Sequence, residues 1–382
     1  MQPAAADHGR LTFFGSGAEN AEIAPRLAAE FGRVMASGRI LNGPEVPRFE
    51  ARIAALTGRA HAAAVNSATD ALFFALRAGG IGRGDEVLVP AFSFVASASA
   101  VLRAGARPVF VDVTAPQAAV AAGTAPCAMD LADAARRLTP RSGGLVWVDL
   151  FGGMADPAAA TDFAARHGLF LLEDASQSFG AAFGPVPAGR LGHASVFSFD
   201  RNKTLGAPGT GGAVLTDDAG LDARVRALRY HGIGEDGFAT LGYNSQMSSL
   251  TAAILELKLD HHAAWTARRR EIAARLDATL GRLPLHCLAW PDDCRHARHK
   301  YVLLCPARAG LEAHLHAMGV PTRRHYPRPL PREPLFAEAI SEAARFPVAE
   351  ALAEQALSLP LHAQLGTDDV AHIASTVAGF FR

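Results

Sequence analysis

The chain has 382 residues, of which 49% are hydrophobic and 19% charged, as is typical of a compact globular protein with a large buried interior. Lysine plus arginine and aspartate plus glutamate both number 37, so no net charge favours nucleic acid or an anionic membrane as a partner. Because no stretch approaches the roughly 20 apolar residues of a membrane span, and the start MQPAAADHGR lacks the apolar run of a signal peptide, we expect a cytoplasmic protein.

Strands and helices alternate from about residue 45 to residue 215. Short apolar runs bounded by Gly, Pro or Asp are typical of strands buried on both faces of a parallel sheet, and they lie at 85–92, 107–113, 144–152 and 169–175. Helical stretches separate them at 69–79, 94–104 and 157–167. The pattern predicts an α/β domain, in which ligands gather at the carboxyl ends of the strands.

The sequence pattern changes after residue 250. Residues 250–280 have the pattern of one long amphipathic helix, and short strands and helices follow it. We therefore predict a large α/β domain over 12–250 and a smaller α+β domain over 251–382. The proline-dense segment 321–335 is expected to be an extended loop on the surface.

The polar segment from Asn66 to Asp70 lies at the start of the helix predicted over 69–79. Free backbone amides at a helix N-terminus, together with Ser and Thr hydroxyls, can bind a phosphate. The same residues also fit a plain capping box between Ser67 and Asp70. The sequence alone favours neither interpretation.

Two charged residues follow neighbouring strands further along. Asp174 ends the apolar run LFLLE and could pair with a protonated pyridine nitrogen, although a helix N-cap is the commoner use of such an aspartate. Lys203 follows the strand-like segment 194–200 and could form a Schiff base, whereas most lysines are solvated surface charges. Either Phe92 or Phe94 could stack on a planar cofactor or belong to the core.

The glycine-rich segment 206–212, GAPGTGG, has the glycine spacing of a nucleotide-binding P-loop. Gly212 stands where the P-loop lysine must be, and a strand-like run rather than a helix follows, so we exclude an NTPase. The neighbourhood of Cys294, His296 and His299 matches no zinc-ligand spacing, and no metal is expected. A phosphate turn, an aromatic residue, Asp174 and Lys203 in this order are the arrangement that a pyridoxal 5'-phosphate (PLP) enzyme needs.

The chain resembles the DegT/DnrJ/EryC1/StrS aminotransferases over nearly its whole length, in blocks such as VNSATDAL, LLEDASQSFGA, FSFDRNKTLGAPGTGG and GYNSQMSSLTAAIL. The resemblance implies a fold-type I PLP-dependent aminotransferase with a mostly parallel central sheet in its large domain. It also implies conversion of a nucleotide-linked keto-deoxysugar to an aminosugar, with glutamate or glutamine as amino donor. The blocks are more similar to members that aminate sugar carbon 3.

The resemblance also implies roles for single residues. Lys203 would form the Schiff base with PLP and shuttle the proton of the transfer, while Asp174 would pair with the ring nitrogen. The other implied cofactor contacts are Ala68, Thr69 and Ser198 to the phosphate, Phe94 stacked on the ring and Gln177 at its 3-hydroxyl. Asn244 would reach the phosphate of the neighbouring subunit's cofactor, which implies a homodimer with shared active sites. His325 and Tyr326 would border the sugar pocket, and the cofactor would alternate between PLP and its amino form, PMP.

Three residues depart from the family pattern. Ala68 and Thr210 replace a common glycine and a frequent glutamate, and Gln246 stands where an arginine that can hold anionic groups is often found. Gln246 therefore leaves the recognition of the amino donor's carboxylate open. Two alternatives remain, namely an aminotransferase acting on a free ketocyclitol or related carbocycle, and a non-catalytic PLP-fold protein with a regulatory or binding role.

Overall fold

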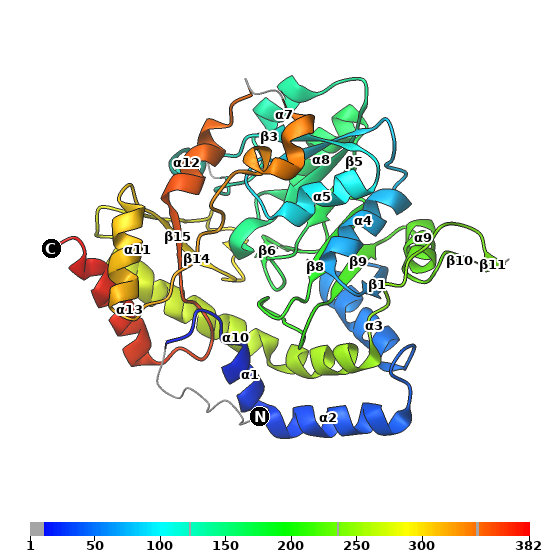
Figure 1. Cartoon of the computed structure of the whole chain (residues 1–382), viewed down its shortest axis with the longest axis horizontal. Coiled ribbons are helices and arrows are strands. Elements are labelled where there is room, and N and C mark those ends of the chain that lie inside the picture. The colour runs from blue at the N-terminus through cyan, green and yellow to red at the C-terminus, as the bar shows by residue number, and fades with distance from the viewer. Residues whose placement is uncertain (1–10, 122–123, 235–236, 341–343) are drawn as a thin grey trace.

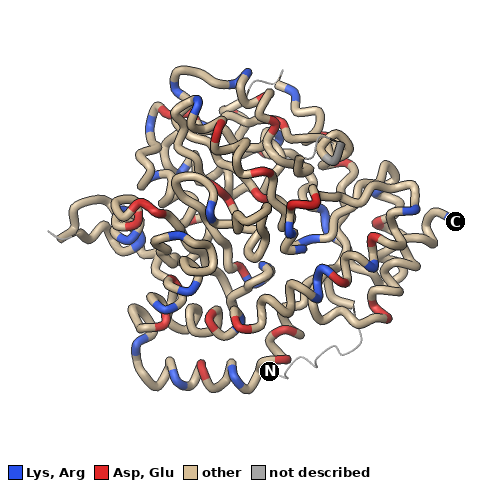
Figure 2. Tube along the Cα trace, turned by 180° about the vertical axis from the view of Figure 1, so that it is seen from behind, with Lys and Arg blue, Asp and Glu red and all other residues tan. Residues whose placement is uncertain are grey.

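A computed structural model describes residues 11–121, 124–234, 237–340 and 344–382. Residues 1–10, on which the signal-peptide expectation falls, lie outside these ranges. Within them, no helix combines the length and the apolar composition that crossing a membrane requires. The chain trace carries basic and acidic residues interspersed with one another (Figure 2), as their equal numbers suggest.

A seven-stranded sheet with the order β1-β9-β8-β5-β4-β2-β3 forms the centre of the molecule (Figure 1). Its strands are β1 (His61–Val65), β2 (Glu86–Pro90), β3 (Arg107–Val111), β4 (Ser142–Val148), β5 (Phe170–Asp174), β8 (Ala194–Ser198) and β9 (Gly212–Thr216). β9 is antiparallel to both of its neighbours, and every other pair in the sheet is parallel. The mostly parallel sheet predicted from the sequence is confirmed.

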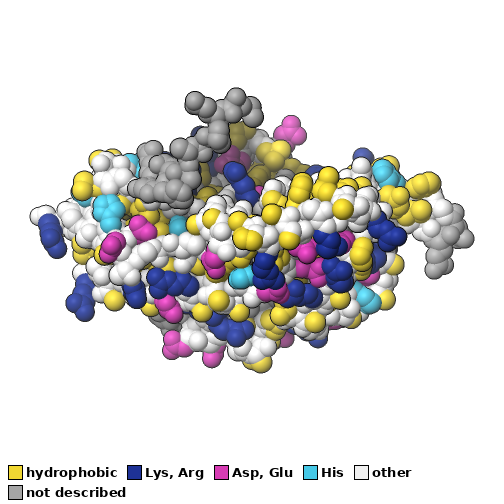
Figure 3. Space-filling view, turned by 90° about the horizontal axis from the view of Figure 1, so that it is seen from below, with side chains coloured by type: hydrophobic (Ala, Val, Ile, Leu, Met, Phe, Trp, Pro, Cys, Tyr) yellow, Lys and Arg dark blue, Asp and Glu magenta, His cyan; other side chains and the backbone are white. Residues whose placement is uncertain are grey.

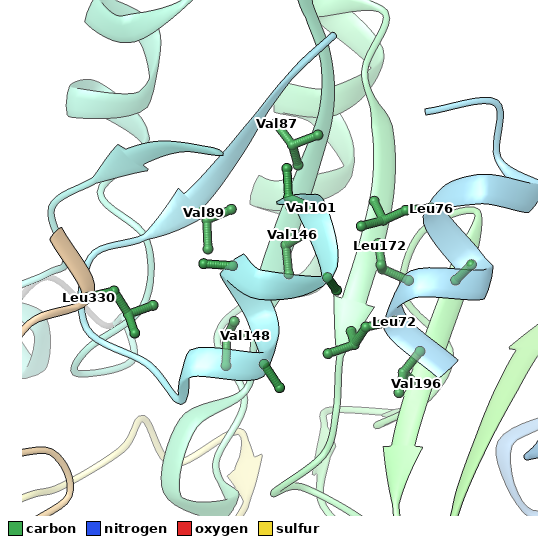
Figure 4. Close-up of a cluster of buried hydrophobic side chains, with 14 of the residues drawn as sticks. Leu72, Leu76, Val87, Val89, Val101, Val146, Val148, Leu172, Val196 and Leu330 are labelled. Atoms are coloured by element: carbon green, nitrogen blue, oxygen red, sulfur yellow. The ribbon is translucent and has the colours of Figure 1, made fainter. Parts of the chain in front are cut away.

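Helices lie between these strands, before β1 and after β9. They are α3 (Glu45–Thr57), α4 (Ala68–Ala78), α5 (Val95–Arg103), α6 (Pro116–Ala121), α7 (Leu131–Arg137), α8 (Pro157–His167) and α9 (Ala219–Arg229), with a 3-10 turn at Leu150–Gly152. The apolar face of α4 places Leu72 and Leu76 in one buried cluster with Leu172 of β5 and Val196 of β8 (Figure 4). Burying each such side chain contributes about 1.5 to 3 kcal/mol, which fixes the helices on the sheet.

The longest helix, α10 (Ser249–Leu280), runs from the central-sheet part to the C-terminal part (Figure 1). Ser248 caps its first turn by accepting a hydrogen bond from the N–H of Thr251. The N-terminal helices α1 (Ser16–Glu22) and α2 (Ala24–Ser37) pack beside it. A buried ion pair of 2.6 Å between Arg269 of α10 and Glu19 of α1 joins the start of the chain to this helix.

The C-terminal part has its own antiparallel sheet, β12 (His286–Cys287), β14 (Tyr301–Leu304) and β15 (Ala356–Leu359), with α11 (Arg308–Ala317), α12 (Pro347–Gln355) and α13 (Thr367–Gly379). Its core, which includes Leu303, Leu311 and Ile373, forms a cluster separate from that of the large sheet. Short strands complete the described chain: β6 (Ala182–Phe183), β7 (Val186–Pro187) and β13 (Cys294–Arg295) form one small sheet, and β10 (Ile233–Gly234) with β11 (Gly237–Phe238) forms a hairpin. The domain boundary at residue 250 stays a prediction.

The expectation of an extended surface loop over 321–335 is wrong in its middle. Leu330 and Pro331 are buried, and 3-10 turns form at Leu330–Arg332 and Pro334–Ala339. The N–H of Leu330 donates to the carbonyl of Ala91 at 2.8 Å, and the side chain of Leu330 joins the cluster that contains Val89 (Figure 4). The apolar side chain between the prolines draws this segment against the end of β2.

Candidate active site

A cavity of about 460 Å³ lies at the carboxyl ends of the central strands, within the size range of small-molecule sites. Residues that follow β1, β2, β5 and β8 make up one part of its lining, the sheet side, and segments from the N-terminus and the C-terminal part make up the other side. The implied site residues that line the cavity are Ala68, Thr69, Phe94, Asp174, Gln177, Ser198, Lys203, His325 and Tyr326. The rim of the parallel sheet therefore holds a cavity, as the sequence predicts.

Lys203 follows β8 in a tight turn, because its N–H donates to the carbonyl of Asp200 at 2.8 Å. Its side chain enters the cavity, where burial lowers the pKa of its amine and the carboxylates of Asp174 and Asp200 partly oppose that shift. A desolvated lysine whose neutral form is accessible can act as a nucleophile. The interpretation of Lys203 as a solvated surface charge is wrong.

Asp174 ends β5 and is buried. Its Oδ2 accepts a hydrogen bond from the Ser97 hydroxyl at 2.7 Å, and its Oδ1 accepts one from the N–H of Ser176 at 3.2 Å. Since no helix begins in this turn, the N-cap interpretation of Asp174 is wrong. The carboxylate instead stands fixed in the wall of the cavity that Lys203 enters.

The N-terminus of α4 faces the same cavity. Ser67 caps the helix by accepting from the N–H of Asp70 at 3.1 Å. The Asp70 carboxylate does not complete a capping box; it accepts from Arg103 at 2.9 Å and from Ser245 at 2.7 Å. The N–H groups of Ala68 and Thr69, which have no intrahelical acceptor, are therefore available at the cavity wall.

A glycine holds this helix start in place. A Cβ added to Gly212 would lie 2.5 Å from the backbone nitrogen of Ala68, so only glycine allows β9 to approach the turn so closely. The glycine-rich segment thus allows close backbone packing beside the cavity. Ser198, on the neighbouring strand, also lines the cavity, and its Oγ accepts from the N–H of Asp200 at 3.3 Å.

The two phenylalanines after β2 have different surroundings. Phe92 is 1% exposed and belongs to the core, whereas Phe94 is 51% exposed and lines the cavity. The ring of Phe94 lies 6.0 Å from that of Tyr326, tilted by 40°. Of the two, Phe94 is therefore the ring available to a planar ligand.

Gln177 links the sheet side of the cavity to the segment that carries Tyr326. Its Oε1 accepts from the N–H of Phe151 and its Nε2 donates to the Tyr326 hydroxyl, both at 3.0 Å. Burial raises the pKa of Tyr326, so its hydroxyl keeps its proton. Nδ1 of His325 lies 2.8 Å from the Ser358 hydroxyl, and burial lowers the pKa of its imidazole, which is therefore neutral.

Several residues of the cavity were missed by sequence reasoning, among them Phe14, Asp200, His299 and Lys300. Asp200 could have been found, because it lies in the same turn as Lys203. Phe14 and Lys300 give no sequence signal, because they reach the cavity from the N-terminal segment and from the start of β14. Burial and the charge of Lys203 lower the pKa of Lys300 to about 7.

Asn244 and Gln246 lie outside this cavity. Both are in the segment after the β10–β11 hairpin. Asn244 is exposed and forms an isolated β-bridge with Tyr230, and Gln246 forms one with Val65. The implied contact of Asn244 with a neighbouring subunit requires a second chain and stays a prediction. Cys294 accepts from the N–H of Met154 at 3.3 Å, and no described group of three His, Cys, Asp or Glu side chains is placed to hold a metal ion.

Comparison with known proteins matches residues 21–378 to the model of the DegT/DnrJ/EryC1/StrS aminotransferase family. A pleiotropic regulatory protein of Geobacillus stearothermophilus is 36% identical over 94% of this chain and 96% of its own. The UDP-N-acetyl-3-dehydro-alpha-D-glucosamine 3-aminotransferase of Acidithiobacillus ferrooxidans is also 36% identical, over 94% of each chain. The crystal structure of S. venezuelae DesV in complex with a ketimine intermediate superimposes with a TM-score of 0.92 at 36% identity, covering 98% of this chain and 99% of that one.

Proposed function

Because this chain belongs to the DegT/DnrJ/EryC1/StrS aminotransferase family, we propose that it transfers an amino group from glutamate or glutamine to the keto group of a nucleotide-linked deoxysugar. The enzyme is a PLP-dependent aminotransferase. The observation that carries the proposal is the meeting of Lys203 and Asp174 in one cavity, where the carboxylate acts on the pKa of the amine.

The residues of the cavity fit PLP. A lysine amine without a hydrogen-bond partner among the described residues suits the aldehyde, and a fixed carboxylate suits the ring nitrogen. The start of α4, with the free N–H groups of Ala68 and Thr69, suits the phosphate. Phe94 and Gln177 would hold the ring between them.

The side chains that line the cavity would have separate roles in the reaction. When bound, PLP acts as an electron sink for the carbon that gains or loses the amino group. Asp174, held by Ser97 and by the N–H of Ser176, would place its carboxylate against the ring nitrogen. Lys203 Nζ moves the proton at the reacting carbon, for which its lowered pKa suits it. His325 and Tyr326 would contact the sugar.

Carbon 3 is the proposed position of amination. The blocks around Lys203 and Asn244 favour it, and the relative from Acidithiobacillus ferrooxidans is named for an amino transfer at position 3. The cytoplasmic location stays a prediction.

The proposed active unit is a homodimer with shared sites. The β10–β11 hairpin region exposes Phe238 (74%) and Leu241 (80%), and it projects from the body of the molecule (Figure 1). α2 exposes Phe31 and Met35, and the side of the molecule on which it lies shows a band of hydrophobic side chains (Figure 3). Exposed apolar groups of this extent suit a protein partner, and Asn244 follows the hairpin directly.

The substrate assay that tests the proposal offers the purified PLP-loaded protein two acceptors. One is a nucleotide-linked 3-keto-deoxysugar and the other a free ketocyclitol, each with glutamate or glutamine as donor. Amination of the first alone is the expected result. Preference for the ketocyclitol would overturn the substrate class, and PLP binding without turnover of either would favour the regulatory alternative suggested by the name of the Geobacillus relative.

A further inference from the structure

The cavity contains one lysine besides Lys203. Among the described residues that line it, the only lysines are Lys203 and Lys300, and no arginine is present. The two lining histidines, His299 and His325, are neutral because burial lowers the pKa of each. Once Lys203 is joined to the cofactor, Lys300 remains as the cation available to a substrate.

Lys300 is held firmly in this position. Its N–H donates to the carbonyl of Phe151 at 3.1 Å, and its ammonium lies 5.0 Å from the centre of the Phe14 ring. The residue is 8% exposed. Within the described chain its Nζ has no hydrogen-bond or ion-pair partner, whereas the other buried lysine, Lys258, donates to the carbonyl of Gly206 at 2.9 Å.

Burial without an acceptor favours the neutral form of a lysine, as the lowered pKa of Lys300 indicates, and an anion bound beside it would favour the charged form. An amino-acid donor carries such an anion next to its reacting atom, since its α-carboxylate and its amino group share one carbon. The phosphates of a nucleotide-linked sugar lie further from the reacting atom, because the sugar ring separates them from the keto carbon. Lys300 and Lys203 line the same cavity, and the charge of Lys203 lowers the pKa of Lys300 while the carboxylate of Asp200 opposes this shift. This nearness of the two lysines suits the nearer anion.

We propose that Lys300 binds the α-carboxylate of the amino donor and sets the preference of the enzyme for amino acids over simple amines. The inference rests on the proposed function. Gln246 stands where the family pattern often has an arginine that can hold anionic groups, and it lies outside the cavity. Lys300 supplies a positive charge inside the cavity. The contact with the Phe14 ring orients the Lys300 side chain in the cavity.

The experiment compares Lys300→Met with Lys300→Arg in the PLP-loaded enzyme. The donor half-reaction is followed by absorbance with glutamate and with 4-aminobutyrate, which lacks only the α-carboxylate. Losing a hydrogen bond to a charged group should lower kcat/KM for glutamate about 10- to 100-fold in Lys300→Met. The value for 4-aminobutyrate should stay within about 3-fold, and Lys300→Arg should restore most of the preference for glutamate.

A binding measurement separates recognition from catalysis. The Kd of glutarate, an unreactive dicarboxylate, measured by calorimetry, should rise about 10-fold or more in Lys300→Met and recover in Lys300→Arg. Lys300→Gln serves as a second neutral variant if the methionine variant misfolds.

Each other outcome has a definite meaning. An unchanged ratio of glutamate to 4-aminobutyrate in a neutral variant overturns the inference. So does a defect confined to the keto-sugar half-reaction, which would assign Lys300 to a phosphate of the nucleotide instead. If the wild type binds no PLP and accepts no amino donor, the proposed function itself has failed, and this is visible before any variant is made.

Discussion

The two sides of the cavity are built in different ways. The side that carries Asp174 and Lys203 consists of turns that directly follow β5 and β8 of one sheet. The opposite side combines Phe14, Lys300 and Tyr326, which come from three distant segments. On the sheet side, neighbouring strands determine where the charged groups meet, whereas the other side exists only when the C-terminal part has packed against the sheet. Cofactor chemistry thus depends on local structure, and substrate contacts depend on long-range packing.

Hydrogen bonds show the same difference. The turn of Lys203 is closed by its own neighbour, through the carbonyl of Asp200. The segment of Lys300 is fixed by the carbonyl of Phe151, which lies in a distant part of the sequence. Gln177 joins the two sides through its bonds to Phe151 and Tyr326. Variants on the sheet side should therefore impair every reaction of the enzyme, and variants on the other side should affect one substrate at a time.

The largest effect is expected for Lys203→Ala. Removing the group that holds the cofactor and moves the proton should lower turnover about 10³- to 10⁴-fold for all substrates. The visible absorbance of the lysine-bound cofactor should disappear as well, in a spectrum recorded after reconstitution with PLP. Retention of either the absorbance or the turnover would contradict the role of Lys203, and Lys203→Arg serves as the charge-preserving control.

Asp174→Asn should have the next largest effect. The amide keeps the shape of the side chain and can still accept from Ser97, but it carries no charge for the ring nitrogen. We expect kcat to fall about 10²-fold in both half-reactions, the scale of losing one electrostatic contact in a catalytic site. The lysine-bound absorbance should persist, which distinguishes this variant from Lys203→Ala. Wild-type kcat in Asp174→Asn would show that the carboxylate is structural only.

A smaller effect on one substrate is expected for Tyr326→Phe on the opposite side. The variant removes the hydroxyl that accepts from Gln177 and that would contact the sugar. Losing one neutral hydrogen bond should lower kcat/KM for the keto-sugar by up to about 10-fold, with the donor half-reaction within about 2-fold. Tyr243→Phe is the matched control, since Tyr243 packs on Phe73 and Phe74 away from the cavity. Equal losses for both substrates would contradict the division between the two sides.

The sequence predicts the residues on the sheet side of the cavity better than those on the other side. The strand pattern was sufficient to place Asp174 and Lys203 at one edge, and helix 157–167 was predicted at the bounds of α8. The strand pattern does not predict that Lys300 and Phe14 line the cavity, because a local sequence pattern does not indicate which distant segments pack over it. The buried middle of 321–335 was missed for a related reason, since its prolines indicated a loop but not the contact of Leu330 with Ala91. His325 and Tyr326 were found only through the resemblance to a family.

The smallest effect concerns Asp149, a buried carboxyl after β4 on the sheet side. One of its oxygens accepts from the Ser178 hydroxyl at 3.1 Å, and the other has no hydrogen-bond partner among the residues that the structure describes. Burial, reinforced by the nearby Glu173, raises the pKa of this carboxyl well above 3.8. The folded state therefore binds a proton that the unfolded state releases above about pH 4. It follows that this residue's contribution to stability is fully present below that pH and is lost as the pH rises.

Asp149→Asn cannot ionise, and its amide can donate a hydrogen bond as the protonated acid does. It should raise the free energy of unfolding by about 1 to 2 kcal/mol at pH 7, which raises Tm by a few degrees, about 2–4 °C per kcal/mol. Thermal unfolding of both proteins from pH 4 to pH 8 measures this, and the difference in Tm should shrink towards pH 4. A constant difference would mean that Asp149 is not the titrating group. Because Asp149 does not line the cavity, kcat should stay within about 2-fold, so that stability and chemistry on the sheet side can be changed separately.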